Sequence, residues 1–422
     1  MLKYFVMTVE ALITAAVLVG LIRGYSRLAN KKLGGLIASI GTGAGFIGAC
    51  VMSYMKNATT KIDTSQWNLR IFIASIAVLV LFLIFSPFKK LCRKPGEIIQ
   101  SVLLGLCSAL LVFYALPDVL AYPYNILLTD STVLSTDFLF KMIGIVLGVI
   151  FILLVQMSFN RGVIRLPKLP AFIILALALA ANGVRFGMNS VGIMLTKRIL
   201  NVMEMDRELY HKLFEIAKFS SNNDILFTYI IIGVSVAVPV ILWAMSFAAN
   251  EPYNNPAEKR KIRKKWKVTR RWANLVIITL ALGVVNFTVL KPLSNKEIEL
   301  SPVEKVTDDN GNIYVPFEDV ADEHLHRFGY TSPDGTEIRF IVIKKPNSSS
   351  YGIGLDACDI CGETGYYEKD GQVVCKLCDV VMNINTIGFK GGCNPIVIPY
   401  SIENGKIVVP VDGLLEYEKE FK

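Results

Sequence analysis

The amino-acid sequence predicts a polytopic α-helical membrane protein with about eight spans and a small C-terminal, β-rich, extracytoplasmic domain that binds metal. The chain has 422 residues, of which 53% are hydrophobic and only 19% are charged. Its mean hydropathy of +0.48 is too high for a soluble globular protein. Five of the eight cysteines lie in the last part of the chain. We therefore expect a membrane domain over 1–293 and a cysteine-rich β-domain over 294–422.

The membrane domain is predicted from apolar runs of about twenty residues, the length that a bilayer core requires. These runs lie near 4–22, 34–55, 70–88, 98–121, 137–157, 171–194, 226–247 and 272–290. The first run is followed by further spans and has no small-residue cleavage pattern, so we interpret it as a retained helix. The second run carries a small-residue face suited to close helix packing, formed by Gly41, Gly43, Gly45 and Gly48.

The orientation of the spans is predicted from the basic residues of the loops. Four loops are basic, and they contain Arg23, Arg27, Lys31 and Lys32; Lys89, Lys90, Arg93 and Lys94; Arg161, Arg165 and Lys168; and the run 259–271. The intervening loops 56–69 and 122–136 are poor in basic residues, so the positive-inside rule makes the four basic loops cytoplasmic and both termini extracytoplasmic. We interpret the run 259–271 as a topological anchor on lipid headgroups rather than a nucleic-acid site.

Histidines contribute little to the predicted membrane domain. The chain has only three, and none lies within a span, which argues against a membrane b-type haem with axial histidines. The pattern of residues 196–224 predicts an amphipathic helix on the outer face. A metal role for His211 with Glu208 and Glu215 is the alternative to a solvated helix face there, and we favour the solvated face.

Polar side chains inside the spans are costly unless they have partners. Glu10 lies in the first span, Asp118 near the end of the fourth, and Asn182, Arg185 and Asn189 share one face of the sixth. If Arg185 pairs with Glu10 or Asp118, the pair is a structural clamp. If the same charges line a cavity, they form an ion or proton path. The sequence leaves both hypotheses open.

The β-domain is predicted from an abrupt change of composition after Ser294. Asn-Gly or Asp-Gly pairs at 310–311, 334–335, 370–371 and 404–405 are typical of hairpin turns. They separate short β-rich runs at Ile313–Pro316, Glu337–Ile343, Tyr351–Leu355, Ile396–Tyr400 and Lys406–Val411. Such a small antiparallel domain has a limited core, so a metal site or disulfides would stabilise it appreciably.

Two Cys-x-x-Cys hooks, thirteen residues apart, provide the strongest chemical signal. They are Cys358-Asp-Ile-Cys361 and Cys375-Lys-Leu-Cys378, and a fifth cysteine, Cys393, follows in a glycine-rich loop. Four thiolates brought together by a hairpin can bind zinc or iron, or hold an iron–sulfur cluster. Two disulfides are the alternative in an oxidising compartment, but they would leave one of five thiols free. The remaining cysteines, Cys50, Cys92 and Cys107, we interpret as small apolar residues.

His324 and His326 are candidate additional ligands. Residues i and i+2 of a strand point to the same face, so the two imidazoles could reach one metal ion. With Cys393 they could contact a second ion.

Several motifs of the β-domain together resemble a family of bacterial and archaeal proteins known as Fe-S-containing membrane proteins. The motifs are Ile338–Lys344, Leu355–Cys361, Val374–Cys378, Asn383–Gly388 and Gly391–Pro395. The resemblance covers the C-terminal domain closely and the membrane part by layout. It implies a role in iron uptake beside permease-like, iron-binding or ABC-type components, with the four hook cysteines as metal ligands. It also implies iron or an iron–sulfur cluster as cofactor, with zinc as the alternative.

The first span, Val9–Gly20, also looks like the first helix of ferric permeases. That helix carries an Arg-Glu-x-x-Glu motif, whereas here only Glu10 matches, because Val6 and Met7 occupy the other two positions. This departure argues against direct iron permeation.

Three functions are compatible with the sequence. The leading hypothesis is a membrane-held metal or redox module that handles iron, or changes its oxidation state, on the outer face for a partner transporter. The alternatives are a metal-ion permease that uses Glu10, Asp118 and Arg185, and a structural zinc ribbon that docks a partner. Whether the module is an iron-directed oxidoreductase or an electron-transfer protein is left open. Lipid is an expected partner and nucleic acid is not.

Overall fold

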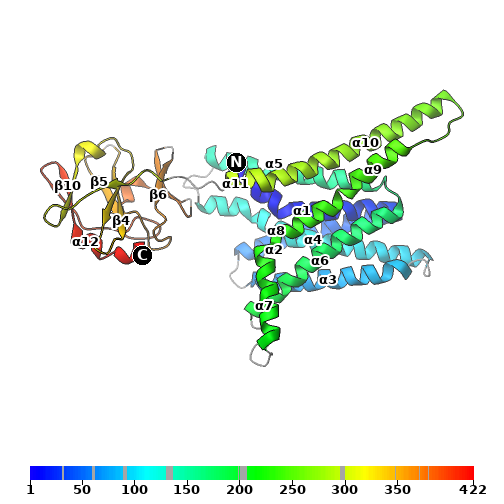
Figure 1. Cartoon of the computed structure of the whole chain (residues 1–422), viewed down its shortest axis with the longest axis horizontal. Coiled ribbons are helices and arrows are strands. Elements are labelled where there is room, and N and C mark those ends of the chain that lie inside the picture. Colours follow the sequence, from blue (N-terminus) through cyan, green and yellow to red (C-terminus); the bar gives the residue numbers. More distant parts are fainter. Residues whose placement is uncertain are drawn as a thin grey trace. The chain divides into compact units, whose positions relative to one another are not determined.

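The computed structural model describes residues 1–422 except 31–32, 59–61, 89–92, 130–135, 198, 200–206, 295–299, 347, 370 and 379. Of the residues singled out above, Lys31, Lys32, Lys89, Lys90, Cys92 and Asp370 therefore lie outside the described residues. The chain divides into two compact units. One comprises Met1–Tyr124 with Leu139–Asn295, and the other comprises Asn125–Phe138 with Lys296–Lys422 (Figure 1).

The first unit is helical. Its elements are α1 (Leu2–Ala29), α2 (Leu33–Ala58), α3 (Thr64–Phe88), α4 (Arg93–Thr129), α5 (Thr136–Val163), α6 (Lys168–Thr196), α7 (Arg207–Asn222), α8 (Asp224–Ser235), α9 (Ala237–Ala248), α10 (Pro256–Val285), the π-helical η1 (Asn286–Leu290) and α11 (Lys291–Ser294). Within the described residues, eight helical stretches are long and apolar enough to cross a membrane, which confirms the predicted spans. The seventh is divided into α8 and α9 close to Pro239, whose missing N–H cannot continue the backbone ladder.

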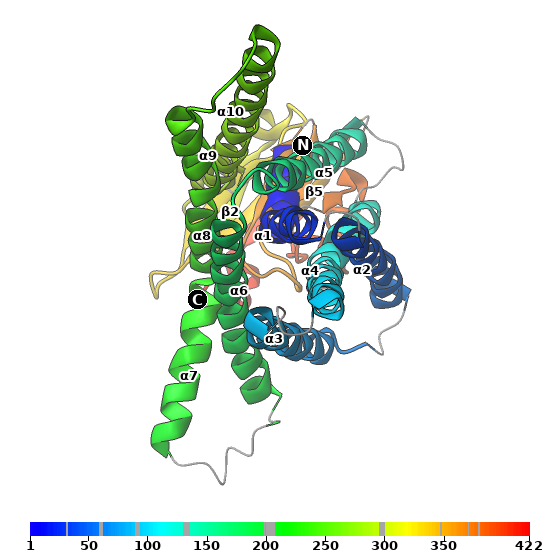
Figure 2. The ribbon, with the colours of Figure 1, turned by 90° about the vertical axis from the view of Figure 1, so that its right-hand side faces the viewer.

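Helix α1 lies at the centre of the helical unit. Its most apolar window is 78% buried, whereas the corresponding windows of the other spans are 28% to 44% buried. Figure 2 shows α1 with other helices around it. Gly20 permits this placement, because a Cβ there would lie 2.7 Å from the Cβ of Phe159 on α5. A helix buried on all sides needs no polar face, and its sequence accordingly has none.

Helices α2 and α4 pack closely through the predicted glycine face. A side chain at Gly41 or Gly45 would collide with the backbone of Gly105 or Ala109, and one at Gly48 would collide with the ring of Phe113. Gly43 differs, because nothing lies within 4 Å of the place where its Cβ would stand. Three of the four glycines, spaced by four and three residues, therefore make the packing face.

Helix α7 corresponds to the predicted amphipathic helix. It begins at Arg207, since residues 198 and 200–206 of the expected range lie outside the described part of the chain. His211 and Glu215 are exposed, and Glu208 pairs with Lys212 at 2.6 Å. Within the described residues, the groups of side chains that could hold a metal ion do not include His211. This arrangement is that of a solvated helix face.

The second unit is built mainly from strands, as predicted. The strands are β1 (Glu304–Lys305), β2 (Asn312–Pro316), β3 (His326–Thr331), β4 (Glu337–Lys344), β5 (Tyr351–Leu355), β6 (Tyr366–Lys369), β7 (Gln372–Cys375), β8 (Val381–Met382), β9 (Ser401–Glu403) and β10 (Lys406–Pro410), with short helices η2 (Phe317–Val320), η3 (Ile384–Thr386), α12 (Val411–Leu415) and η4 (Glu418–Phe421). The described strands form three sheets, in the orders β1-β3-β4-β5, β2-β10-β9 and β6-β7-β8.

The predicted turns connect paired strands. Asn404 and Gly405 have φ angles of 47° and 77°, as a two-residue hairpin loop between β9 and β10 requires. Gly371, with φ of 71°, stands in the two-residue loop between β6 and β7. The strand predicted at Ile396–Tyr400 was wrong. That segment makes two backbone hydrogen bonds, both at Ile396, and does not continue as a ladder, because Pro399 lacks the N–H group that a ladder needs.

Strand β4 separates two apolar cores of the β-domain, because side chains alternate between the faces of a strand. Ile338, Phe340 and Val342 face the larger core, which also receives residues of β2, β3, β5 and β10. Ile341 and Ile343 face the smaller core, which contains Cys358 and Cys375 and has the other three cysteines packed against it. The cysteine cluster is therefore part of a folded core.

Candidate metal centre

The first hook begins directly after β5. The backbone N–H of Cys361 donates to the Cys358 Sγ at 3.1 Å, which folds the hook into a tight knuckle. The chain then reverses at Gly362, whose φ of 66° is costly for other residues. The backbone N–H of Gly362 donates to the carbonyl of Cys358 at 2.9 Å and closes the turn. The hook thus directs both sulfurs to one side.

The second hook begins at the end of β7. Cys375 is paired with Tyr366 across the β6–β7 hairpin, which places this hook beside the first. The backbone N–H groups of Leu377 and Cys378 act to lower the pKa of Cys375, and that of Val380 acts to lower the pKa of Cys378. Such N–H groups stabilise thiolates, as they do around protein-bound iron and zinc.

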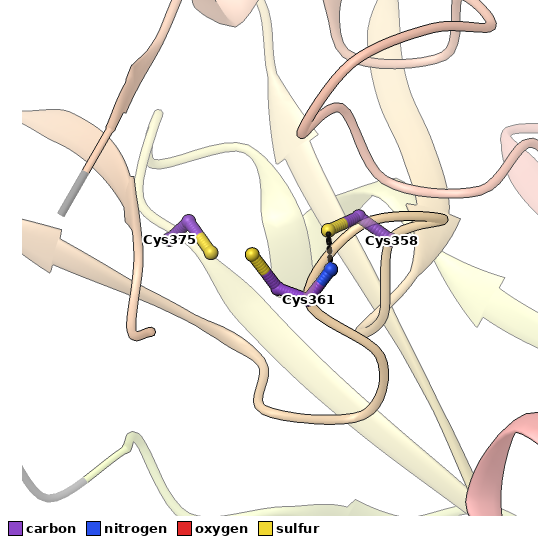
Figure 3. A group of neighbouring side chains, drawn as sticks. All are labelled: Cys358, Cys361 and Cys375. Carbon is purple, nitrogen blue, oxygen red and sulfur yellow. Dashed lines mark hydrogen bonds between the residues drawn. The ribbon is translucent and has the colours of Figure 1, made fainter. Parts of the chain in front are cut away.

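The five cysteine sulfurs of the β-domain lie in two overlapping groups. Cys358, Cys361 and Cys375 form one group and Cys361, Cys378 and Cys393 the other, and within each group all sulfurs lie within 4.8 Å of one another. Figure 3 shows the first group, with the sulfurs of Cys361 and Cys375 directed toward each other. The Sγ atoms of Cys378 and Cys393 are 3.5 Å apart. All five thiols are free, and Cys361 belongs to both groups.

These separations fit a single thiolate-bound ion. Four sulfurs at about 2.3 Å from a tetrahedral ion stand roughly 3.8 Å apart. Within each group the three sulfurs are close enough to share one ion, whereas the four hook sulfurs do not all lie within 4.8 Å of one another. A multi-iron cluster places several atoms between its cysteines and holds their sulfurs farther apart. The donor set therefore suits iron or zinc bound by thiolates.

The protonation of the thiols depends on burial and on neighbouring cysteines. Burial raises the pKa of Cys361 and of Cys375, and burial together with Cys378 raises the pKa of Cys393 to about 11. Burial opposes ionisation of Cys378 as well, but the Val380 N–H and the adjacent thiols outweigh it and lower its pKa. An arriving metal ion must therefore displace protons, so its apparent affinity increases with pH.

A buried polar network supports the metal-binding core from behind. The guanidinium of Arg327 donates to Asp356 Oδ2 at 2.7 Å, and both side chains are completely buried. The other Asp356 oxygen accepts the Tyr366 N–H at 2.9 Å, and the Tyr366 hydroxyl donates to the Cys393 carbonyl at 2.6 Å. Sequence reasoning missed these residues, because nothing in the local pattern distinguishes them from surface residues.

The two histidines do not join the sulfurs. Strand β3 begins only at His326, so the predicted shared strand face was wrong. His324 Nδ1 lies 2.9 Å from Glu368, and His326 Nε2 lies 2.8 Å from Asp322. Hydrogen bonding to Glu368 raises the pKa of His324. That pair therefore stabilises the fold below about pH 6.5, and its contribution is lost as the pH rises through the raised pKa.

The charged residues of the membrane part are paired, but not as expected. Arg185 pairs with Asp224 at the start of α8, with its Nε 2.6 Å from Oδ1. Neither Glu10 nor Asp118 is its partner, so the predicted pairing was wrong. Glu10 pairs with Lys291 at 2.6 Å, and Asp118 with Lys56 at 3.1 Å.

The two asparagines of the shared face have different surroundings. Asn189 accepts a hydrogen bond from Ser220 of α7 at 2.6 Å, and Asn182 is buried. Together with the Arg185–Asp224 pair, these contacts connect α6 to α7 and α8. The arrangement supports the clamp hypothesis rather than an ion path.

The Arg185–Asp224 pair can be tested by substitution. We expect Arg185→Ala to lower the free energy of unfolding by about 1–3 kcal/mol, because it leaves Asp224 unpaired near the membrane. Adding Asp224→Asn should restore part of that loss, whereas adding Glu10→Gln should not. The measurement is the fraction of monodisperse protein after heating in detergent. If Asp224→Asn and Glu10→Gln restored the stability of Arg185→Ala equally, the observed pairing would be contradicted.

Comparison with known proteins bears on the β-domain. No curated protein and no solved structure matches the chain. A family model does match, over residues 320–421, and it is described as membrane iron-sulfur containing protein FtrD-like. The matched region contains all five cysteines of the metal-binding core. The resemblance drawn from the cysteine motifs is thus confirmed over residues 320–421, which match the model of the FtrD-like membrane iron-sulfur containing proteins.

Proposed function

We propose that the protein is a membrane-anchored redox module of iron uptake, which binds iron in its β-domain and changes the oxidation state of iron outside the cell for a partner transporter. The observation that carries the proposal is the gathering of five free thiols in one core of the β-domain. The family description, which joins membrane location to iron–sulfur content, supports it.

In this proposal, thiolates of the two hooks hold the ion, with Cys393 beside them. Iron held by these thiolates would supply one-electron exchange with iron at the outer face, one being oxidised as the other is reduced. The N–H groups of the knuckles stabilise negative charge on the sulfurs. Cys358 and Cys375 are buried among apolar side chains such as Ile341 and Val373, which exclude water on that side.

The opposite side of the core is accessible. Cys361, Cys378 and Cys393 are half-buried, and the hook tips Ile360 and Leu377 are 68% and 62% exposed. External iron or a partner can therefore approach the sulfurs from this side. The site is thus shielded from water on one side and open on the other. This arrangement allows external iron to come close enough for electron exchange.

A structural zinc site is the second candidate, because the same compact sulfur spacing fits zinc. Metal analysis of the purified full chain distinguishes the two. We expect about one iron per chain, a visible absorption band and its reversible loss on reduction. Cys50→Ser should leave all three unchanged. A colourless protein with one zinc per chain and no redox change would support the docking role instead.

The extracytoplasmic placement of the β-domain is part of the proposal, and reporter fusions test it. Because the basic loops alternate along the chain, a reporter that is active only in the cytoplasm should work when fused after Lys267 and fail after Lys422. Cytoplasmic activity after Lys422 would place the metal-binding core inside the cell and overturn this part of the proposal.

A further inference from the structure

A cavity of about 780 Å³ lies in the helical unit, between the turn that joins α5 to α6 and the helices α9 and α10. Its lining includes Arg165, Met245 and the side chains that α10 presents between Lys261 and Thr269. Figure 1 shows α9 and α10 side by side, continuing together beyond the ends of neighbouring helices. None of the functions discussed above uses this cavity.

The charge of the cavity is positive. Lys261, Lys264 and Lys265 are spaced by three and four residues, so α10 presents them on one face. Lys265 is neutralised by Glu251 at 2.6 Å, and Glu251 also accepts the indole N–H of Trp266 at 3.0 Å. Within the described residues, no carboxylate lies within 4.0 Å of the ammonium of Lys261 or Lys264. Two ammonium groups thus face the cavity without a counter-ion.

Apolar side chains of the membrane spans also line the cavity. They include Met245 on α9 and Val268, which lies on α10 one turn beyond Lys264, and both helices belong to stretches long enough to cross a bilayer. The 30 residues of α10 extend about 45 Å, more than the roughly 30 Å of a hydrocarbon core. The basic half of α10 therefore stands at the level of the headgroups. Trp243 and Trp266 lie on this part of the two helices, where interfacial aromatic residues concentrate.

We propose that this cavity is a binding site for an anionic phospholipid, whose headgroup phosphate pairs with Lys261 and Lys264. The acyl chains would then follow the apolar side chains of Met245 and Val268. A uniformly basic surface would attract any anion. A cavity lined by both ammonium groups and apolar side chains matches the amphiphilic character of a lipid. Free phosphate shares the headgroup chemistry but not the apolar part.

Lipid binding to the purified full chain in detergent tests the proposal, using native mass spectrometry with phosphatidylglycerol and phosphatidylcholine as probes. We expect phosphatidylglycerol to bind more tightly. Lys261→Gln with Lys264→Gln should weaken its binding about twenty-five-fold, since each lysine near a lipid phosphate contributes about five-fold. The matched control is Arg263→Gln with Lys267→Gln, which removes equal charge from the opposite face of α10 and should change binding less than two-fold.

The remaining outcomes each decide the proposal. Equal losses in the two double variants would show diffuse attraction to a basic helix and would overturn a specific site. Displacement of the lipid by millimolar inorganic phosphate would identify free phosphate as the ligand and overturn the lipid assignment. Quenching of Trp266 fluorescence by brominated phosphatidylglycerol, lost in Trp266→Phe, would place the lipid at the cavity. Absence of that quenching in a folded wild-type chain would contradict the site.

Discussion

Replacement of Cys361 by serine is expected to remove the metal from the β-domain and to unfold its smaller core. Cys361 is the cysteine whose sulfur belongs to both sulfur groups, so its replacement leaves neither group complete. Metal binding by structural thiolate sites contributes about 10–16 kcal/mol, which is comparable to the whole stability of a small domain. Loss of metal and loss of structure should therefore occur together.

The measurement is metal content beside protease resistance of the β-domain in the full chain. Cys393→Ser is the informative comparison, because four thiolates remain and most of the metal should be retained with an altered reduction potential. Cys50→Ser, a change at a free cysteine of α2, should affect neither quantity. Retention of both metal and protease resistance in Cys361→Ser would refute a thiolate-bound ion at this site.

The second large effect is expected from Asp356→Ala. This change leaves the guanidinium of Arg327 buried without its counter-ion and removes the acceptor for the Tyr366 N–H. Breaking a fully buried ion pair typically costs about 3–5 kcal/mol. The β-domain should be destabilised by that amount, and the loop that holds Cys393 should loosen, because Tyr366 contacts its backbone.

Hydrogen exchange of β3 and β4 in the full chain measures this destabilisation. Asp356→Asn should have an intermediate effect, since it keeps an oxygen acceptor but loses the charge. Asp334→Ala is the matched surface control, because Asp334 pairs with Lys422 at 3.3 Å where both side chains are at least half exposed. Such a pair contributes about 0–1 kcal/mol. Similar protection in Asp356→Ala and the wild type would show that the buried pair is dispensable.

Much of this architecture could be predicted from the sequence, because it rests on local patterns. Apolar runs of bilayer length gave the spans, and Asn-Gly or Asp-Gly pairs located the hairpins. The hooks were recognisable because a knuckle needs only four consecutive residues.

Features that depend on contacts between distant residues were not predictable in this way. Arg185 was assigned the wrong partner because Asp224 lies two residues outside the predicted seventh span and was not counted as a membrane acid. Strand β3, which carries the buried Arg327, was not among the predicted β-rich runs. The support of the metal-binding core by Asp356 emerges only when three strands are assembled.

Strand β4 is buried on both faces, and this restricts how the β-domain can fold. A slip of one residue in β4 would send Arg339 toward the larger core and Phe340 toward the cysteines, because every side chain of the strand would change face. The hooks can therefore converge only in chains whose β4 is aligned correctly. A metal ion that binds only the converged hooks would favour correctly aligned chains by mass action. Metal binding would then stabilise the correctly aligned fold of the newly made domain over misaligned ones.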